Sequence, residues 1–362
     1  MESHAALVDD LLAGVVNPPE TFEEYLSSYA QVVGDLVNDF IPSGSHDGMD
    51  DYLYAPLLGY SRNGGKRHRP LICLAACVAV GGDVRRAVSS AAAIEHFHTA
   101  ALIHDDIADE ATLRRGEPCL HLTQGLGLAI NMGDLGLSLV NGTVVRDPLL
   151  EDGVKVRVIA ELIEMTRRTI EGQALDLGWA RDERYDITPE DYLVMATHKT
   201  AHYSGAVPLA VGAIVGGGSE TEIEGLRAYG LDTGLAFQIQ DDLLNIEGDP
   251  AVVGKDFCSD ITEGKRTLMV VHALQNSADR GRLVDILSAK TTDADTLREA
   301  VAGFHQGRQG GFIVRTAIES ADVWAMRADM QYLQRVWEAI VQQQRGDDGQ
   351  DDGDDHEDDH RG

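Results

Sequence analysis

Hydrophobic residues along this chain recur with helical spacing far more often than with strand spacing. Long stretches without Gly or Pro are rich in alanine, leucine and valine, and few alternating runs end at turn residues. Aromatic residues make up only 6% of the sequence, which also favours helix over sheet. The pattern predicts an all-α protein, and 43% hydrophobic residues are ample for a buried core.

Short breaks separate the predicted helices. One run without Gly or Pro extends from about Val84 to about Glu110. We expect a looser region over the glycine-rich residues 125–136 and a turn over DPLLEDG, residues 147–153. No break is long enough to divide domains, so the sequence predicts a single helical domain over residues 1–345.

A helix start is predicted at TPED, residues 188–191. A hydroxyl cap is followed there by proline at the first helical position and then by two acidic residues, which the helix dipole favours. The helix that begins here would carry Lys199 and Thr200 in its interior.

The formal charge of −30 argues against a nucleic-acid-binding protein, because binding to a phosphate backbone requires a basic surface. Residues 346–362 hold nine acidic residues and one arginine, a net charge of −8 that leaves −22 on the rest of the chain. Their composition predicts a disordered acidic tail rather than a site.

The four cysteines do not form a CxxC pair or an evident disulfide framework. Cys73 and Cys77, one helical turn apart, suit two small buried residues. The first residues lack the basic start of a signal peptide, and the longest apolar run, residues 206–218, is too short to span a bilayer. We therefore expect a soluble, cytoplasmic protein without stable membrane insertion.

Two acid-rich stretches, each at the end of an apolar segment, share one spacing. Their oxygen-bearing side chains are Asp105, Asp106 and Asp109 in the first stretch and Asp241, Asp242 and Asn245 in the second. Positions i, i+1 and i+4 of a helix fall within about 100° of one another, so each set points into one sector. One such motif is more often a solvated helix face. Two of them suggest that five carboxylates and an amide converge on one cavity of a helical bundle.

These oxygen ligands suit Mg²⁺, which commonly bridges a few carboxylates to substrate phosphate oxygens. Zinc is disfavoured because His and Cys do not occur at zinc-ligand spacings. Basic residues, scarce in this chain, gather beside glycines or the acidic motifs: Lys66, Arg67, Arg69, Arg114, Arg115, Lys199, Lys255 and Lys265. Each alone could be a surface ion pair. Together they predict a diphosphate site.

The motifs, in this order, resemble those of the trans-isoprenyl diphosphate synthases, also called the polyprenyl synthetase family. They are GGKRHRP, FHTAALIHDDIADEATLRRG, EGQALDL, HKT, FQIQDDLLNIEGD and GKDFCSDITEGKRT. The motifs span residues 64–267, and the likeness of the helical remainder extends to most of residues 20–340. The resemblance implies an isoprenoid synthase-type all-α bundle around a deep central cavity, and a homodimer.

The resemblance also implies a role for each matching residue. Three Mg²⁺ ions would be held by Asp105, Asp109 and Asp241, with Asp106, Asp242 and Asn245 completing the metal motifs. The allylic diphosphate would contact Arg114, Lys199, Gln238 and Lys255, and isopentenyl diphosphate would contact Lys66, Arg69, His98 and Arg115. Lys265 would help to close the mouth of the site, and Thr200, Gln238 and the Lys199 carbonyl would shield an allylic carbocation.

The implied reaction is a prenyl transfer. Metal and cationic side chains would stabilise the departing diphosphate, the double bond of isopentenyl diphosphate would attack the carbocation, and loss of a proton would give a product five carbons longer. Asn245 departs from the family pattern, which usually has aspartate at that position, and we expect activity to survive this change.

Product length depends on the positions that precede Asp105. Ala101 and Ala100 stand four and five residues before it, where family members that stop at fifteen carbons typically carry a bulky aromatic residue. Phe97, eight residues before Asp105, lies roughly 12 Å from it along the helix axis. We expect a product of twenty carbons or more, although the alanines could instead only pack against a neighbouring helix.

Two other readings remain open. A class I terpene cyclase shares the fold and the first aspartate motif, but usually lacks the second DDxxD and the isopentenyl diphosphate residues. A non-catalytic subunit of a heteromeric prenyl synthase usually loses aspartates from a metal motif. This chain retains every aspartate of both motifs except at Asn245.

Overall fold

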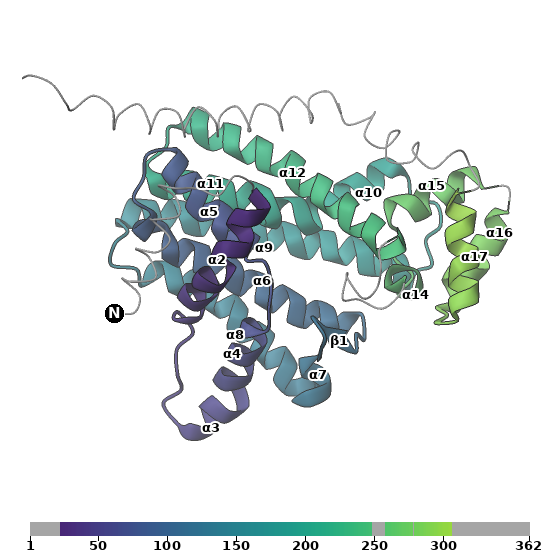
Figure 1. The fold of residues 1–362 in the computed structure, drawn as a ribbon, viewed down its shortest axis with the longest axis horizontal. Helices are drawn as coiled ribbons and strands as arrows, with labels where there is room; N and C mark the ends of the chain where they lie inside the picture. The colour runs from purple at the N-terminus through teal and green to yellow at the C-terminus, as the bar shows by residue number, and fades with distance from the viewer. Residues whose placement is uncertain (1–21, 248–257, 278, 306–362) are drawn as a thin grey trace, which may run out of the picture. The chain divides into compact units, whose positions relative to one another are not determined.

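The computed structural model describes residues 22–247, 258–277 and 279–305, all within the compact unit Met1–Ala317 (Figure 1). The predicted acidic tail lies outside these residues. The described elements are α2 (Phe22–Asn38), α3 (Asp47–Met49), the π-helix η1 (Asp50–Tyr54), α4 (Ala55–Arg62), α5 (His68–Ala79), the 3-10 helix η2 (Val84–Ala87), α6 (Val88–Ala108), β1 (Leu113–Arg114), β2 (Glu117–Pro118), α7 (Leu120–Thr123), α8 (Leu126–Val145), α9 (Asp152–Arg181), α10 (Pro189–Ala196), the π-helix η3 (Thr197–Ala206), α11 (Val207–Gly216), α12 (Glu220–Glu247), α14 (Ser259–Thr262), α15 (Leu268–Asn276), α16 (Arg280–Ala289) and α17 (Ala294–His305).

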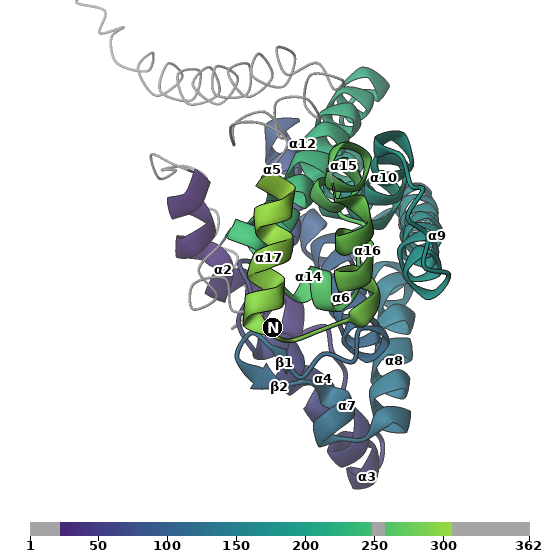
Figure 2. The same ribbon diagram turned by 90° about the vertical axis from the view of Figure 1, so that its right-hand side faces the viewer.

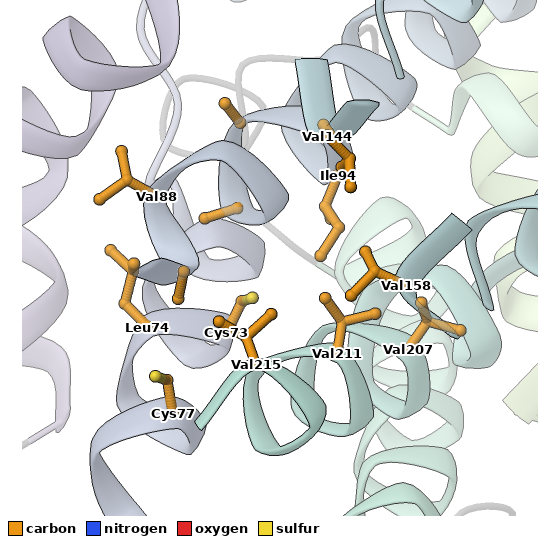
Figure 3. Packing of buried hydrophobic residues seen from close by; sticks show 14 of the residues in the cluster. Cys73, Leu74, Cys77, Val88, Ile94, Val144, Val158, Val207, Val211 and Val215 are labelled. Carbon is orange, nitrogen blue, oxygen red and sulfur yellow. The ribbon is translucent and has the colours of Figure 1, made fainter. Parts of the chain in front are cut away.

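The all-α prediction is confirmed: in the described residues, the single sheet is the two-residue hairpin of β1 and β2. Helix α6 is the centre of the main core, because every residue from Val88 to Ala100 is buried. Helices α5, α8 and α11 pack against it or against one another, as Figure 3 shows for buried residues of this core. Cys73 and Cys77 are free thiols within it, as predicted.

A second core lies around the C-terminal half of α12. Residues of α9, α10 and α12 pack there with α14, α15, α16 and α17 (Figures 1 and 2). This core fixes the segment between α12 and α15, which carries several of the residues considered for the site.

The prediction of a loose region over residues 125–136 is wrong, because most of them form the start of α8. Its glycines allow close helix packing: a Cβ atom at Gly136 would lie 2.9 Å from the Cβ of Ala100 on α6. By length and composition α8 could also cross a membrane, but 44% of its most apolar window is buried and it packs along α6. That is the behaviour of a core helix.

The predicted helix start at Thr188 is confirmed. Its side chain accepts from the Asp191 backbone N–H, and the Asp191 carboxylate accepts from the Thr188 N–H, which completes a capping box ahead of Pro189. The helix does not continue as a regular α-helix. From Thr197 to Ala206 it widens into the π-helix η3, which contains both Lys199 and Thr200, before α11 begins. π-Helical turns are frequent at functional sites.

Glycines hold α12 directly against η3. A Cβ atom at Gly230 would lie 2.5 Å from the carbonyl oxygen of Gly205, and one at Gly234 would lie 2.7 Å from the carbonyl oxygen of Ala201. The two backbones are therefore in contact, which fixes the position of α12, and of the second acidic motif at its end, relative to η3.

We predict that Gly230→Ala lowers the free energy of unfolding by about 2–3 kcal/mol, because the new methyl group has to displace backbone. Gly225, on the same helix, has open space around its Cα, so Gly225→Ala is expected to leave stability unchanged or raise it by up to about 1 kcal/mol. Urea denaturation measures both. Equal stability of the two variants would contradict this packing.

Candidate active site

Both acidic motifs lie at the ends of their helices. Asp105 and Asp106 occupy the last turn of α6, and Asp109 is the residue that caps it, while the second motif lies in the last two turns of α12. The segment from Cys258 to Thr267 connects them. Its Lys265 Nζ lies 2.9 Å from Asp109 Oδ2, and the Asp260 backbone N–H donates to Asn245 Oδ1.

Asp105 is held by two elements other than its own. Gln173 of α9 donates to its Oδ1 at 2.7 Å. Burial raises the pKa of this carboxyl, but Lys199 and Lys265 outweigh burial and hold the pKa at about 2. Lys199 in turn donates to Asp176 Oδ2 at 2.5 Å. Asp105 is thus a charged, half-buried carboxylate.

Asp106 has a different environment from Asp105. It is 1% exposed, accepts from the Tyr60 hydroxyl at 2.8 Å, and receives the Arg114 guanidinium at 2.7 Å. Because both carboxylate oxygens are engaged, Asp106 anchors Arg114 and the short β-hairpin to the end of α6.

Asp109 forms an ion pair with Lys265, whose Nζ also lies 2.5 Å from Glu263 Oε2. Burial raises the pKa of Asp109, an effect that Lys265 opposes and Asp105 reinforces. Burial likewise raises the pKa of Glu263, to about 7. The single positive charge of Lys265 therefore faces two carboxyl groups, those of Asp109 and Glu263.

The second motif belongs to a buried hydrogen-bond network. Asp242 accepts from Tyr192 at 2.7 Å and from Gln238 at 2.6 Å, and Gln238 accepts from Thr200 of η3. Burial and the nearby Asp260 raise the pKa of Asp242 to about 7. Asp241, beside it, is half-buried.

Asn245 joins α12 to α14 in this structure. Its amide nitrogen donates to Ser259 Oγ at 2.8 Å, and its amide oxygen accepts from the Asp260 backbone N–H at 3.1 Å. Both ends of the amide are thus engaged by the start of α14. This geometry explains why an amide suits the position, since a carboxylate could not donate to Ser259.

The residues matched to isopentenyl diphosphate lie near the loop that precedes α5. The Arg69 guanidinium stacks 4.4 Å from the Tyr203 ring centre and donates to Ser204. Arg115 donates to the carbonyls of Asn63 and Gly64 at 3.0 and 3.1 Å. Lys66 is exposed at the edge of the same loop.

His98 is buried beside these cations. Its Nδ1 has no hydrogen-bond partner in the described part of the chain. Burial, reinforced by Arg69 and Arg115, lowers its pKa well below the ordinary value of 6.5, so the ring is neutral at pH 7. Two of the other predicted residues, Arg69 and Arg115, therefore act on His98.

The residues considered for product length all lie on α6, but in different surroundings. Ala101 is half-buried, whereas Ala100 is buried against Gly136 of α8. Phe97 is buried, and its ring meets Tyr203 edge to face with 5.7 Å between ring centres. Ala100 thus packs against a neighbouring helix, which was the alternative to a role in product length.

Known proteins with similar sequences show the family of this chain. The polyprenyl synthetase family model matches residues 50–303. The chain is 44% identical over 245 residues to a short chain isoprenyl diphosphate synthase of Methanothermobacter thermautotrophicus, covering 67% of this chain and 73% of that protein. It is 35% identical over 258 residues to a geranylgeranyl diphosphate synthase of Sulfolobus acidocaldarius, covering 70% and 75%. The chain belongs to the polyprenyl synthetase family.

Solved structures give the same result for the fold. The crystal structure of a geranylgeranyl pyrophosphate synthetase from Pyrococcus horikoshii superposes with a TM-score of 0.73 at 32% identity, covering 84% of this chain and 89% of the other. A geranylgeranyl pyrophosphate synthase of Corynebacterium glutamicum, crystallised with isoprenyl diphosphate and magnesium, gives 0.71 at 27% identity, covering 83% and 90%. This polyprenyl synthetase is therefore an enzyme that transfers prenyl groups, and the relatives named here are synthases rather than terpene cyclases.

Several site residues of this polyprenyl synthetase were missed by the sequence reasoning. They are Tyr60, Gln173, Asp176, Tyr192, Asp260 and Glu263. EGQALDL carried a usable signal, because its Gly, Gln and Asp occur at i, i+1 and i+4, the spacing of the aspartate motifs themselves. The tyrosines carried none, since a lone Tyr in an apolar segment does not indicate its partner. Lys255 lies outside the described residues.

Among residues 22–247, 258–277 and 279–305, no group of three or more Asp, Glu, His or Cys side chains is arranged to bind a metal ion. One ion pair and one hydrogen bond engage the carboxylates of the first motif instead. Lys265 and Gln173 occupy oxygens of Asp109 and Asp105 that the sequence assigns to metal.

His98 gives a pH prediction. The pKa of His98 is lower in the folded protein than in the unfolded chain, so unfolding takes up a proton below about pH 6.5. The buried His98 therefore costs no stability above that pH, and it lowers the free energy of unfolding increasingly as the pH falls. His98→Gln is expected to flatten the pH dependence of the unfolding free energy between pH 7.5 and 5. His104→Gln, a change at a partly exposed histidine on the same helix, serves as the control. Identical slopes for His98→Gln and the wild type would contradict the burial of a neutral His98.

Proposed function

We propose that this enzyme joins isopentenyl diphosphate to an allylic diphosphate, using Mg²⁺ at the two aspartate motifs, and that its product has twenty carbons or more. The observation that carries the proposal is the meeting of both motifs on the segment of Cys258 to Thr267, through Asp109 with Lys265 and Asn245 with Asp260. A diphosphate bound there would have metal ligands and lysines within reach at once.

The donor set fits Mg²⁺. Its members are carboxylate oxygens, which hard divalent cations prefer, and burial together with neighbouring carboxylates raises the pKa of Asp109, Asp242 and Glu263. This surplus of negative charge is what a divalent cation would balance. By family resemblance Asp105, Asp109 and Asp241 would hold three ions, which would neutralise charge on the departing diphosphate.

The cationic side chains would take the diphosphate oxygens. Arg114 is oriented by Asp106, so its guanidinium is fixed beside the first motif. Lys199 and Lys265 are paired with Asp176 and Asp109, and substrate phosphate would offer each of them a second anionic partner. The allylic cation that forms would face the oxygens of Thr200 and Gln238, which the π-helix and α12 hold together.

Isopentenyl diphosphate would bind at Lys66, Arg69, His98 and Arg115. Arg69 and Arg115 lie close enough to lower the pKa of His98, which supports a shared anion site. A neutral His98 would accept or donate one hydrogen bond without adding charge.

Product length of twenty carbons or more is supported by two observations. No aromatic side chain stands at Ala100 or Ala101, and relatives of this chain are named geranylgeranyl diphosphate synthases. Since Ala100 packs against α8, the half-buried Ala101 is the better candidate to line the space for the growing chain.

Incubation of the purified protein with isopentenyl diphosphate, Mg²⁺ and each allylic starter, followed by mass spectrometry, tests the proposal. We expect extension by five-carbon units to at least twenty carbons, and loss of turnover by a factor of 100 or more when a chelator removes the metal. Ala101→Phe is expected to shorten the product, whereas Ala101→Ser retains its length. No extension with any starter would contradict the reaction, and unchanged length in Ala101→Phe would contradict the role of this position.

We also propose a homodimer, formed through an exposed apolar stripe on α9. Four large hydrophobic residues recur there every seven positions, with exposed fractions of 37–67%: Val156, Ile163, Ile170 and Leu177. Ala160 and Ala174 stand four positions after Val156 and Ile170, whereas Arg167 stands four positions after Ile163. A helix with such a stripe buries it against another helix when a partner is present, and Figure 2 shows α9 along one side of the described helices.

Ile163→Asp combined with Ile170→Asp is expected to convert a dimer to a monomer, because two charges would be buried without partners. Met49→Asp, at a similarly exposed methionine on α3, is the control. Light scattering after gel filtration gives the mass. A wild-type monomer, or a double variant that stays dimeric, would contradict the stripe as an interface.

A further inference from the structure

Three residues of EGQALDL share one face of α9 and contact groups that the site depends on. Gly172, Gln173 and Asp176 stand at i, i+1 and i+4, so they project into the same sector of the helix. That face meets η3 and also reaches the end of α6. None of the three is assigned to metal or substrate above.

Gly172 sets the distance between α9 and η3. A Cβ atom there would lie 2.2 Å from the backbone nitrogen of Lys199 and 2.6 Å from its Cα. Backbone atoms cannot move aside as a flexible side chain can, so the missing side chain is what permits Lys199 to sit directly against α9.

Gln173 and Asp176 then hold two oppositely charged groups apart. Gln173 donates to Asp105 at 2.7 Å, and Asp176, 4% exposed, accepts from Lys199 at 2.5 Å. Lys199 is attracted to Asp176 first and to Asp105 next, since those two carboxylates are the leading negative charges that raise its pKa. Gln173 and Asp176 thus each engage one member of this attracting pair.

A direct pair of Lys199 and Asp105 would block both of their proposed tasks. The carboxylate would lose an oxygen for metal, and the ammonium would lose its freedom to bind phosphate. In a buried site such a pair is costly to break, because each charge would be left without a partner.

We propose that Gln173 and Asp176 are positioning residues, which keep Lys199 from closing on Asp105 and so keep the metal and allylic diphosphate site open. The proposal rests on the proposed function of this site. The proposal concerns the allylic substrate only. The residues matched to isopentenyl diphosphate lie on α5, on α6 and in the loops that precede α5 and follow α6. Gln173 and Asp176 bond to Asp105 and Lys199 instead.

Thermal stabilisation by Mg²⁺ with inorganic diphosphate tests this without turnover. The wild type, Asp176→Asn and Gln173→Leu are compared with Asp182→Asn, a change at an exposed aspartate next to the end of α9 that pairs with Arg181. We expect the Mg²⁺ concentration for half-maximal stabilisation to rise about tenfold in Asp176→Asn and Gln173→Leu, and to stay unchanged in Asp182→Asn.

Steady-state kinetics add a readout that general damage would not produce. In both α9 variants the KM for the allylic diphosphate is expected to rise about tenfold, whereas the KM for isopentenyl diphosphate stays within twofold of the wild type. Circular dichroism establishes that each variant is folded. If loss of the buried charge unfolds Asp176→Asn, Gln173→Leu decides, because it leaves no charge unpaired.

The results separate this proposal from the function itself. A wild type that Mg²⁺ and diphosphate stabilise, with folded Asp176→Asn and Gln173→Leu variants that respond identically or lose affinity for both substrates equally, would overturn the positioning role alone. A wild type that gains no stability from Mg²⁺ and diphosphate would contradict the metal site, and the positioning role with it.

Discussion

The burial of many carboxylates in one helical bundle is the constraint on which this structure depends. Charged groups in a low-dielectric interior require partners, and the described residues supply them from several distant elements. Lys265 pairs with Asp109 across 156 positions of sequence, and Lys199 pairs with Asp176 of another helix. Lys199 and Lys265 partly neutralise these carboxylates in the absence of substrate. On the proposed function a diphosphate would bind the same two lysines, so folding stability and substrate binding would depend on one set of charges.

Close backbone packing gives these charges fixed positions. Gly172 admits η3 against α9, and Gly230 with Gly234 admits α12 against the other side of η3. The widened π-helix is thereby held between two backbones, and Thr200 bonds to Gln238 rather than to solvent. Glycines at these helix contacts thus fix the positions of the site residues, as large apolar side chains fix the helices around the core.

The sequence predicted the helices and the capping box at Thr188 because these features are local. Its prediction that the two motifs converge on one cavity stays a prediction. The sequence failed over residues 125–136, where glycine serves helix packing, a distinction that composition does not carry. It also did not identify Tyr60 and Arg114 as the partners of Asp106. Such contacts depend on partners elsewhere in the sequence, which spacing alone does not specify.

The most direct test of the account is a crystal structure with Mn²⁺ and a non-reactive allylic diphosphate analogue, in which anomalous scattering locates the metal. The account predicts metal on Asp105, Asp109 and Asp241, Lys265 moved from Asp109 to phosphate, and the bonds of Asp106 to Tyr60 and Arg114 retained. Metal bound elsewhere, or an intact Lys265 to Asp109 pair with the analogue in place, would contradict it.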